Sequence, residues 1–233
     1  MKILITAGGT TEPIDTVRGI TNFATGSLGK LTAEAFLQAS HQVILLAGQT
    51  AVIPEPHKNL TVRRIMDTQD LMESMADLVP QVDVVIHSMA VSDYRPVYMT
   101  GLEQFSEQLS RQELLDFRPQ TQENKISSKA DFQIMLLEKT PKVIQEIKKW
   151  KPSVILFGFK LLSGVTETHL LNIAKEKMNT TKADFIVAND LATIKNGQHK
   201  AFILDKQQRL IQLNTKQEIA NKIVEKAQEA YHG

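Results

Sequence analysis

Cysteine is absent from the 233 residues of this sequence, which excludes disulfides, thiolate metal sites and a cysteine nucleophile. No apolar run approaches the ~18 residues of a membrane-spanning helix, and the N-terminus has the pattern of a strand rather than a signal peptide. Neither charge sign dominates, because 27 Lys and Arg against 26 Asp and Glu leave a net charge of +1. This balance offers no electrostatic attraction for nucleic acid or an anionic membrane. We therefore expect neither partner, and a cytoplasmic location.

Several signatures of catalysis and cofactor binding are also missing. The six histidines are scattered without metal-ligand spacing, and His87 is the only one at the end of a predicted strand. The sequence contains neither a G-x-S-x-G elbow nor the lysine and Ser/Thr pair of a P-loop. The tight G-x-G-x-x-G turn is absent, and no acidic residue ends the second predicted strand. The lack of this glycine turn and of this acidic residue disfavours an NAD(P)-linked oxidoreductase.

The residues that are present alternate between strand and helix patterns. A hydrophobic content of 42% and a charged content of 23% are those of an ordinary globular protein. Predicted strands cover 2–6, 42–47, 61–65, 82–87, 153–159 and 185–188, and predicted helices cover 30–40, 67–79, 141–150, 167–179 and 216–231. This alternation predicts one α/β domain over residues 1–233, with a doubly wound, mostly parallel, Rossmann-like sheet.

Two segments do not follow this alternation of strands and helices. Residues 97–125 are polar, carry charges of both signs and show no clean strand, so we expect a long flap there. Residues 201–212 read as a C-terminal β-hairpin, with strands at 202–204 and 210–212 around a polar turn. The hairpin can either extend the sheet of its own protomer or pack across the two-fold axis of a homodimer.

The most informative segment follows the first predicted strand. It contains Gly8-Gly9-Thr10, then a polar loop with Arg18 and Asn22, and then a second glycine cluster at Gly26 and Gly29. In an open parallel sheet, phosphates and nucleotides bind at the carboxyl ends of the strands, where this loop would lie. The separation of the two glycine clusters predicts a larger site than a plain Rossmann turn.

Four segments that follow predicted strands should meet at the same edge. They are residues 8–22, 88–95, 159–160 and 189–190, each polar or glycine-containing. Because the carboxyl ends of parallel strands share one edge of the sheet, these segments converge on one predicted cleft. This convergence is stronger support for a site than any single motif.

Individual residues around this cleft allow more than one interpretation. Thr140 before Pro141 predicts the N-cap of a helix. The exposed backbone amides at this helix start, together with Lys139, could hold a phosphate. Alternatively, the segment only begins the helix and binds nothing. Asp93 suits Mg²⁺ or a ribose hydroxyl, or else pairs with Arg95 to shape a turn.

Three lysines could likewise either take part in the site or simply lie on the protein surface. Lys125, at the edge of the predicted flap, could be brought over a triphosphate to neutralise its charge. Lys177 and Lys182 lie in or after the helix that precedes the strand at 185–188. The ordinary fate of such lysines is a solvated surface.

Together these motifs resemble phosphopantothenoylcysteine synthetase. The matching pattern runs through Gly8–Thr10, Glu12-Pro-Ile-Asp, Arg18, Asn22, Gly26 and Gly29, then Ala90-Val-Ser-Asp93-Tyr-Arg95, Lys125-Ile-Ser-Ser and Ala188-Asn189-Asp190. Many bacterial members are fused behind a flavin-dependent decarboxylase. This chain starts at the synthetase motif, so the resemblance implies the free-standing form, with no FMN.

The resemblance implies a two-step ligation in coenzyme A biosynthesis. A nucleoside triphosphate, CTP in most bacterial relatives, activates the carboxylate of 4′-phosphopantothenate as an acyl-nucleotide and releases pyrophosphate. The amine of L-cysteine then attacks the acyl carbon, which forms the amide and releases the nucleoside monophosphate. No protein nucleophile is needed, since positioning and charge neutralisation, with Mg²⁺ on the phosphates, carry the catalysis.

The resemblance also implies roles for single residues. Asn22 would contact the acyl intermediate and be needed for its conversion, Arg18 would hold the acyl substrate or its phosphate, and Lys125 would stabilise the triphosphate. The implied nucleotide-binding residues are Gly8, Gly9, Thr10, Gly26, Ser88, Met89, Ala90, Asp93, Lys139, Thr140, Pro141, Phe159, Lys177 and Lys182, with Asp93 also a candidate Mg²⁺ ligand.

The sequence departs from the family pattern in places that bear on the nucleotide. Many bacterial relatives have Ser-Ser-Gly-Lys where this chain has residues 24–27, and a second lysine where it has Thr181, next to Lys182. Lys160 after Phe159 resembles the ATP-using eukaryotic branch. The resemblance to most bacterial relatives still makes CTP the expected nucleotide, and these departures make ATP the alternative. A nucleotide-binding regulatory domain without turnover would draw on the same predicted cleft.

Overall fold

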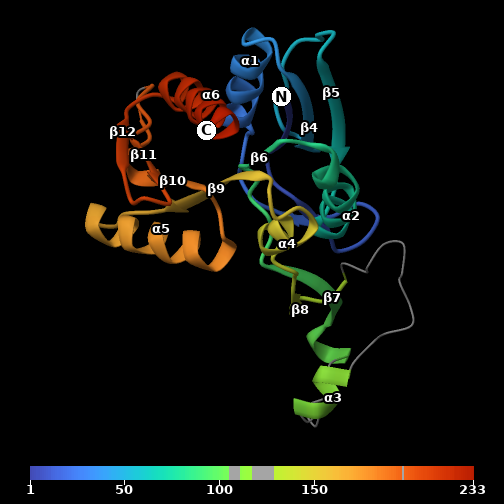
Figure 1. Cartoon of the computed structure of the whole chain (residues 1–233). Helices are drawn as coiled ribbons and strands as arrows, with labels where there is room; N and C mark the ends of the chain where they lie inside the picture. The colour runs from blue at the N-terminus through green and yellow to red at the C-terminus, as the bar shows by residue number, and fades with distance from the viewer. Residues whose placement is uncertain (105–110, 117–128, 196) are drawn as a thin grey trace.

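The computed structural model describes residues 1–104, 111–116, 129–195 and 197–233. Its main feature is an eight-stranded sheet in the order β12-β11-β10-β9-β6-β1-β4-β5 (Figure 1). The strands of this sheet are β1 (Lys2–Ala7), β4 (Gln42–Gly48), β5 (Leu60–Ile65), β6 (Val84–His87), β9 (Ile155–Leu162), β10 (Phe185–Asp190), β11 (Ala201–Asp205) and β12 (Leu210–Leu213).

The strands from β10 to β5 pair in parallel, and β11 and β12 pair antiparallel at one edge. In chain order the parallel strands follow the Rossmann arrangement, in which the two halves of the chain diverge from β1 and β6. This confirms the predicted α/β class with a doubly wound, mostly parallel sheet. The hairpin extends its own protomer's sheet, which is one of the two uses expected of it.

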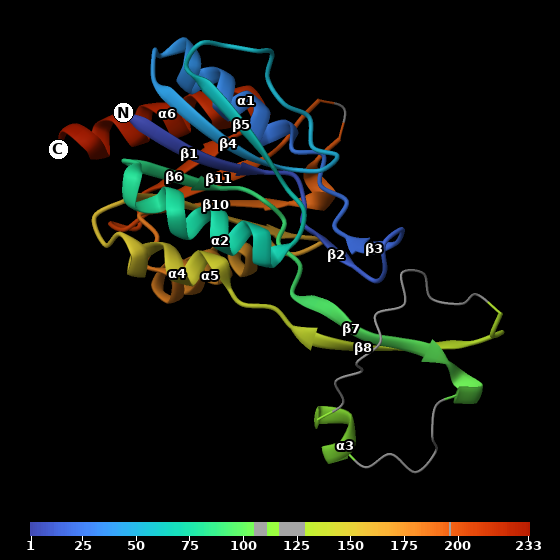
Figure 2. The ribbon, with the colours of Figure 1, turned by 90° about the vertical axis from the view of Figure 1, so that its right-hand side faces the viewer.

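Helices cover both faces of the sheet. The described helices are α1 (Ser27–Gln38), α2 (Thr68–Leu78), α3 (Arg111–Asp116), α4 (Val143–Trp150), α5 (Glu167–Thr181) and α6 (Lys216–His232), with short 3₁₀ turns η1 (Val79–Gln81), η2 (Leu102–Gln104) and η3 (Leu191–Thr193). α1 and α6 bury one face, and α2, α4 and α5 bury the other (Figures 1 and 2). Within the described residues, no helix has both the length and the apolar character that crossing a bilayer requires.

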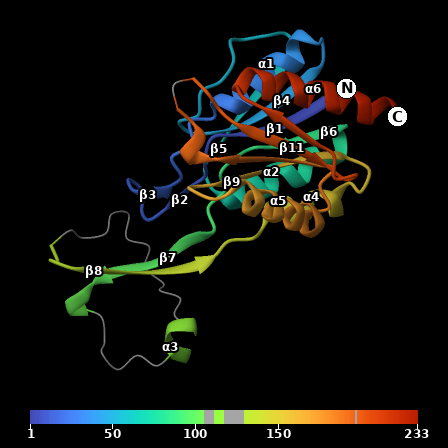
Figure 3. The ribbon, with the colours of Figure 1, turned by 90° about the vertical axis from the view of Figure 1, so that its left-hand side faces the viewer.

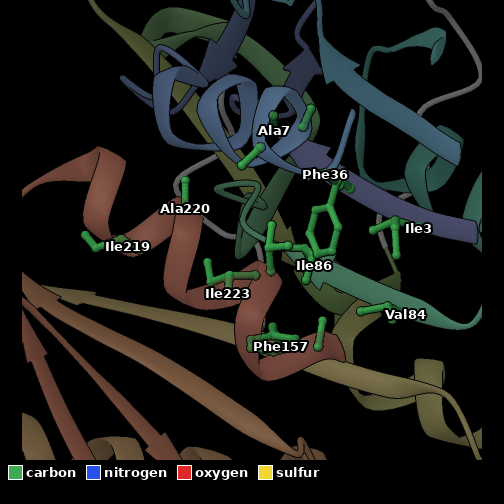
Figure 4. Packing of buried hydrophobic residues seen from close by; sticks show 14 of the residues in the cluster. Ile3, Ala7, Phe36, Val84, Ile86, Phe157, Ile219, Ala220 and Ile223 are labelled. Atoms are coloured by element: carbon green, nitrogen blue, oxygen red, sulfur yellow. The ribbon is translucent and has the colours of Figure 1, made fainter. Parts of the chain in front are cut away.

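Each face has its own hydrophobic core, because successive side chains of a strand point to opposite sides. On the side of α1 and α6, Phe36, Ile86 and Phe157 pack together with Ile223 (Figure 4). On the other side, Val85 and the neighbouring strand residues pack against α2, α4 and α5. The inner parallel strands, such as β1, β4 and β6, are apolar on both faces, which is why they read as continuous hydrophobic runs in the sequence.

Side-chain caps fix the starts of three helices. Asp67, as predicted, accepts from the backbone N–H of Asp70 at the start of α2. Thr166 and Thr215 do the same for α5 and α6. α1 begins differently, after Gly26 in the left-handed conformation (φ 76°), which favours glycine.

The prediction for residues 97–125 is wrong at its start. β7 (Tyr94–Gly101) is a strand, and it pairs antiparallel with β8 (Gln133–Lys139) in a two-stranded ribbon that projects from the sheet (Figures 2 and 3). The pairing is irregular next to Pro96, which has no N–H to donate. Apart from η2 and α3, the rest of the predicted flap lies outside the described residues.

The predicted helix start at Thr140 is also wrong. α4 begins at Val143, and Lys142 occupies the N-cap position without a side-chain hydrogen bond. Thr140 instead donates its hydroxyl proton to the carbonyl oxygen of Ser92 at 2.5 Å. A tertiary contact therefore takes the hydroxyl that the local sequence assigns to a helix cap.

Candidate active site

The candidate site lies between the ends of β1 and β6, where the Rossmann topology reverses. The segments that follow these two strands stay together, since Ala90 N–H donates to Gly8 O at 2.8 Å and Thr10 N–H donates to Ala90 O at 3.1 Å. The sequence predicts that residues 8–22 and 88–95 converge, and this pairing confirms it.

Asn22 is held against both segments. Its Nδ2 donates to Ala90 O at 3.2 Å, and a Cβ placed on Gly9 would lie 2.9 Å from the backbone oxygen of Asn22. Glycine at position 9 therefore leaves the space that Asn22 occupies. Gly8 (φ 85°) needs the left-handed conformation, and Gly26 packs against it, since a Cβ on Gly26 would lie 3.1 Å from Gly8 N.

Between the glycine clusters the chain forms a small hairpin, β2 (Thr11–Pro13) and β3 (Gly19–Thr21). At its turn, the Arg18 guanidinium donates to Asp15 at 2.6 Å and 3.0 Å. Buried Glu12 accepts from the backbone N–H of Thr68 at 3.0 Å and from its hydroxyl at 2.6 Å, which ties the hairpin to the start of α2. The sequence motif contains Glu12, but this buried role follows only from the fold.

A second set of contacts joins the segment after β6 to the end of the ribbon. Ser92 N–H donates to the hydroxyl of Thr10 at 3.0 Å, and that hydroxyl donates to Ser92 Oγ at 3.1 Å. Thr140 N–H donates to Asp93 O at 3.0 Å. The backbone and hydroxyl of Thr140 thus contact the predicted nucleotide-binding segment at Ser92 and Asp93. Lys139, the last residue of β8, is exposed, as is Pro141.

Cationic side chains gather beside this segment. Lys142 forms an ion pair with Asp93, so the alternative pairing of Asp93 with Arg95 is wrong, and Arg95 pairs with Glu138 at 2.5 Å instead. Burial, followed by the charges of Lys142 and Lys160, lowers the pKa of Lys177, while Asp93 acts in the opposite direction. Lys177 is therefore within electrostatic reach of Lys142, Lys160 and Asp93. We refer to Lys142, Lys160 and Lys177 as the lysine cluster.

Sequence reasoning missed Lys142, and it included Lys160 only in the converging segment 159–160, without giving it a role at the site. Lys142 follows the Lys139-Thr140-Pro141 motif directly, and its proximity to that motif was the available signal. Lys177 is half-buried rather than on a solvated face, because α5 packs with this side toward β9 and β10.

His87, Ser88 and Met89 continue from the end of β6. Ser88 Oγ donates to Thr6 O at 2.6 Å, and Met89 is buried in the core on the side of α2, α4 and α5. The imidazole of His87 is buried beside Thr6, and burial followed by the charge of Lys177 lowers its pKa to about 4. His87 is therefore neutral at physiological pH.

Other predicted residues lie apart from this group. Phe159 packs on the side of α1 and α6, opposite the lysine cluster. Lys182 (φ 55°) ends α5 just before Asp184, whose N–H donates to Leu156 O near the start of β9, at the amino edge of the sheet. The structure therefore does not bring Lys182 to Asn22. Lys125 lies outside the described residues.

Asp190, in the predicted segment after β10, has a structural role. Its carboxylate accepts from the backbone N–H groups of Ala192 at 2.9 Å, Gly164 at 2.8 Å and Val165 at 3.1 Å. These bonds, Ala192 first, lower the pKa of Asp190. Asp190 therefore anchors the loop that follows β9. Next to it, Asn189 Nδ2 donates to buried His199 Nε2 at 3.1 Å.

Comparison with known proteins identifies the family of this chain. Residues 1–106 and 113–231 match the family model described as DFP, the C-terminal domain of DNA/pantothenate metabolism flavoproteins. The chain belongs to this family. The match confirms the family resemblance that the sequence motifs carry.

The similarity extends to individual proteins. The coenzyme A biosynthesis bifunctional protein CoaBC of Methanocaldococcus jannaschii is 30% identical over 227 residues, which are 97% of this chain and 50% of that protein. The chain spans about half the length of these curated relatives, CoaBC of Methanocaldococcus jannaschii and of Thermococcus kodakarensis.

Two solved structures share the fold over nearly the whole chain. The DNA/pantothenate metabolism flavoprotein from Streptococcus pneumoniae is 47% identical with a TM-score of 0.91, covering 98% of this chain and 99% of that one. The C-terminal domain of a CoaBC protein is 28% identical with a TM-score of 0.72, covering 98% and 94%.

Proposed function

We propose that this DFP-family chain joins 4′-phosphopantothenate to L-cysteine at the expense of a nucleoside triphosphate. The observation that carries the proposal is Asn22, held over Gly9 by its bond to Ala90, at the edge where a Rossmann sheet binds nucleotides. Asn22 and the residues around it lie within the part of the chain that matches the family model.

The proposed reaction has two balanced steps. A carboxylate oxygen of the acyl substrate attacks the α-phosphorus of the triphosphate, and pyrophosphate leaves. The cysteine amine then attacks the acyl carbon, loses a proton as the amide forms, and displaces the nucleoside monophosphate. Neither step requires a protein nucleophile, so residues that hold charge and position are sufficient.

The residues of this chain suit such a reaction. The lysine cluster offers positive charge to a triphosphate, and half-buried Lys177 offers it where solvent screening is weaker. Because Asn22 uses Nδ2 to bond Ala90 O, its Oδ1 remains as an acceptor, which we assign to the attacking amine. Arg18, positioned by Asp15, is proposed to hold the acyl substrate, and Lys125 is proposed to stabilise the triphosphate.

Mg²⁺ would be held mainly by the phosphates. Among the described residues, no three His, Asp or Glu side chains form a metal-binding group. Asp93 is exposed and can supply one carboxylate beside the phosphates, which fits the few protein ligands that Mg²⁺ takes in nucleotide sites. The ion would neutralise phosphate charge, and the lysine cluster would complete that neutralisation.

Pyrophosphate release tests the proposal. Purified protein is incubated with 4′-phosphopantothenate, cysteine, Mg²⁺ and each of the four nucleoside triphosphates. We expect release with CTP, while preferential release with ATP would assign the alternative nucleotide. No release with any triphosphate would contradict ligation, and nucleotide binding without cysteine-dependent turnover would favour a regulatory domain.

A homodimer is the proposed assembly. The hairpin β11–β12 already completes the sheet of its own protomer, which leaves the ribbon β7–β8 as the better candidate interface. A two-stranded ribbon is marginal by itself, and this one carries the exposed large apolar side chains Tyr94, Phe132 and Leu137 near or within its strands. Sedimentation at micromolar concentration, with Leu137→Lys as the disrupting variant, tests this assignment.

A further inference from the structure

His87 is a buried titratable group with no role in the proposed reaction so far. It ends β6, two residues after Val85, and therefore points to the sheet face that carries α2, α4 and α5. Lys177 of α5 is close enough for its charge to act on the imidazole. The β9 residue paired with His87 is Gly158, which adds no side chain of its own, although Ile144 and Ile186 reach the space beside it.

The hydrogen bonds around Thr6 determine where His87 carries its proton. Thr6 Oγ1 accepts from Met89 N–H at 3.2 Å and lies 3.0 Å from His87 Nδ1. The hydroxyl has one proton, and since Thr6 is fully buried, that proton would be unpaired unless Nδ1 accepts it. In neutral His87, Nε2 then carries the N–H.

The Nε2 atom of His87 is left available as a donor. No described residue hydrogen-bonds to it, and His87 keeps 6% of its surface exposed. Its titratable neighbours are Lys177 and, around that lysine, Lys142, Lys160 and Asp93. A neutral N–H beside this excess of positive charge can bond an anion without adding repulsion to the cluster.

We infer that His87 is a further nucleotide-binding residue, whose Nε2–H donates to a phosphate oxygen of the triphosphate held by the lysine cluster. Thr6 acts as a positioning residue, because its hydroxyl fixes the tautomer that presents this proton. The inference rests on the proposed function for the identity of the ligand. It adds a donor that the resemblance does not imply, because His87 lies before the residues of this segment to which the resemblance gives a role.

Binding measurements on variants test the inference. By calorimetry, CTP and inorganic tripolyphosphate are titrated into the wild type, His87→Leu and His87→Gln, since Gln places an N–H close to the position of Nε2. Loss of one bond to a charged oxygen predicts roughly 10- to 100-fold weaker binding of both ligands by His87→Leu. His87→Gln should bind within a few-fold of the wild type. His57→Leu, an exposed histidine outside the site, is the matched control.

Thr6 supplies a readout that a general packing defect would not give. Thr6→Val removes the hydroxyl at nearly constant volume and should weaken tripolyphosphate binding in the wild type, whereas Thr6→Ser should not. In the His87→Gln background Thr6→Val should have little effect, because glutamine has no tautomer to fix. Melting temperatures establish that each variant is folded.

Two results would overturn the inference. One is wild-type affinity of folded His87→Leu for both ligands, and the other is weaker binding of CTP with unchanged binding of tripolyphosphate, which would place His87 at the nucleoside. Wild-type ligation is assayed in parallel. If the wild type binds tripolyphosphate but releases no pyrophosphate with any nucleotide, the ligase proposal fails, and the comparison of His87 variants still stands by itself.

Discussion

Gly9→Ala is expected to damage the proposed reaction more than it damages the fold. The added Cβ would lie 2.9 Å from Asn22 O and 3.3 Å from Asn22 Cβ, so the two segments must move apart. Neither can yield easily, because Asn22 O accepts from Ala24 N–H at 2.8 Å and Asn22 Nδ2 bonds Ala90 O. Overpacking of this kind costs about 1–3 kcal/mol of unfolding free energy.

The same displacement moves the Asn22 amide, which the proposed second step requires. Misplacement of a positioned group by up to ~1 Å lowers turnover about 10- to 100-fold. We therefore expect Gly9→Ala to slow amide formation more than pyrophosphate release, so that the acyl-nucleotide accumulates. Rapid quench with separate quantification of pyrophosphate, acyl-nucleotide and amide measures the two steps.

Two comparisons make this prediction sharp. Gly158→Ala adds the same methyl group 2.9 Å from Ile186 Cδ1, the end of a flexible side chain, so its melting temperature should fall less than that of Gly9→Ala. If Gly9→Ala acts through Asn22, it should have almost no further effect on turnover in an Asn22→Ala background. Normal amide formation by Gly9→Ala, or independent effects in the double variant, would refute the reasoning.

Three further predictions concern buried or partly buried groups. Glu12→Ala leaves the N–H and hydroxyl of Thr68 without their acceptor and should cost about 1–3 kcal/mol in urea unfolding, whereas Glu12→Gln, which keeps an acceptor oxygen, should cost less. Burial raises the pKa of Asp184, but hydrogen bonds, that of Lys148 first, outweigh it and lower the pKa. Asp184 thus stabilises the fold above its unfolded pKa and loses this effect as pH falls, so Asp184→Asn should melt earlier at pH 7 and converge with the wild type in acid. His87 binds a proton below pH ~6.5 only when unfolded, so stability should decrease from there to about pH 4, and less steeply in His87→Gln.

The sheet and most helices were predictable because their signals are local. Buried parallel strands read as apolar runs, and Asp67 marks the start of α2 by a cap that needs only its own turn. The ribbon β7–β8 was not predictable in this way. Its partner strand is distant in the sequence, and Pro96 interrupts its pairing, so no continuous apolar or alternating pattern identifies it.

The residues of the candidate site likewise fall into those with a local sequence signal and those placed by contacts between distant segments. Asn22, Asp93 and Lys177 were recognisable from motifs, whereas Lys142 enters the site because α4 starts two residues later than Pro141 suggests. The proton on His87 depends on Thr6, which lies on a neighbouring strand. Such contacts between distant segments leave no mark in the local sequence.

The separated glycines acquire a physical reason in the fold. Gly26 packs on Gly8, with only 3.1 Å between the position of a Cβ on Gly26 and Gly8 N, although a whole hairpin lies between them in the sequence. The strand and helix of an ordinary Rossmann turn are therefore joined in space, and β2–β3 is an insertion that leaves and returns at the same point. Because Glu12 anchors the outgoing strand to α2 and Asn22 follows the returning one, the insertion brings a functional amide back over Gly9. A tight G-x-G-x-x-G turn would leave no chain to carry Asn22, so the absence of that motif is a consequence of the site that this protein builds.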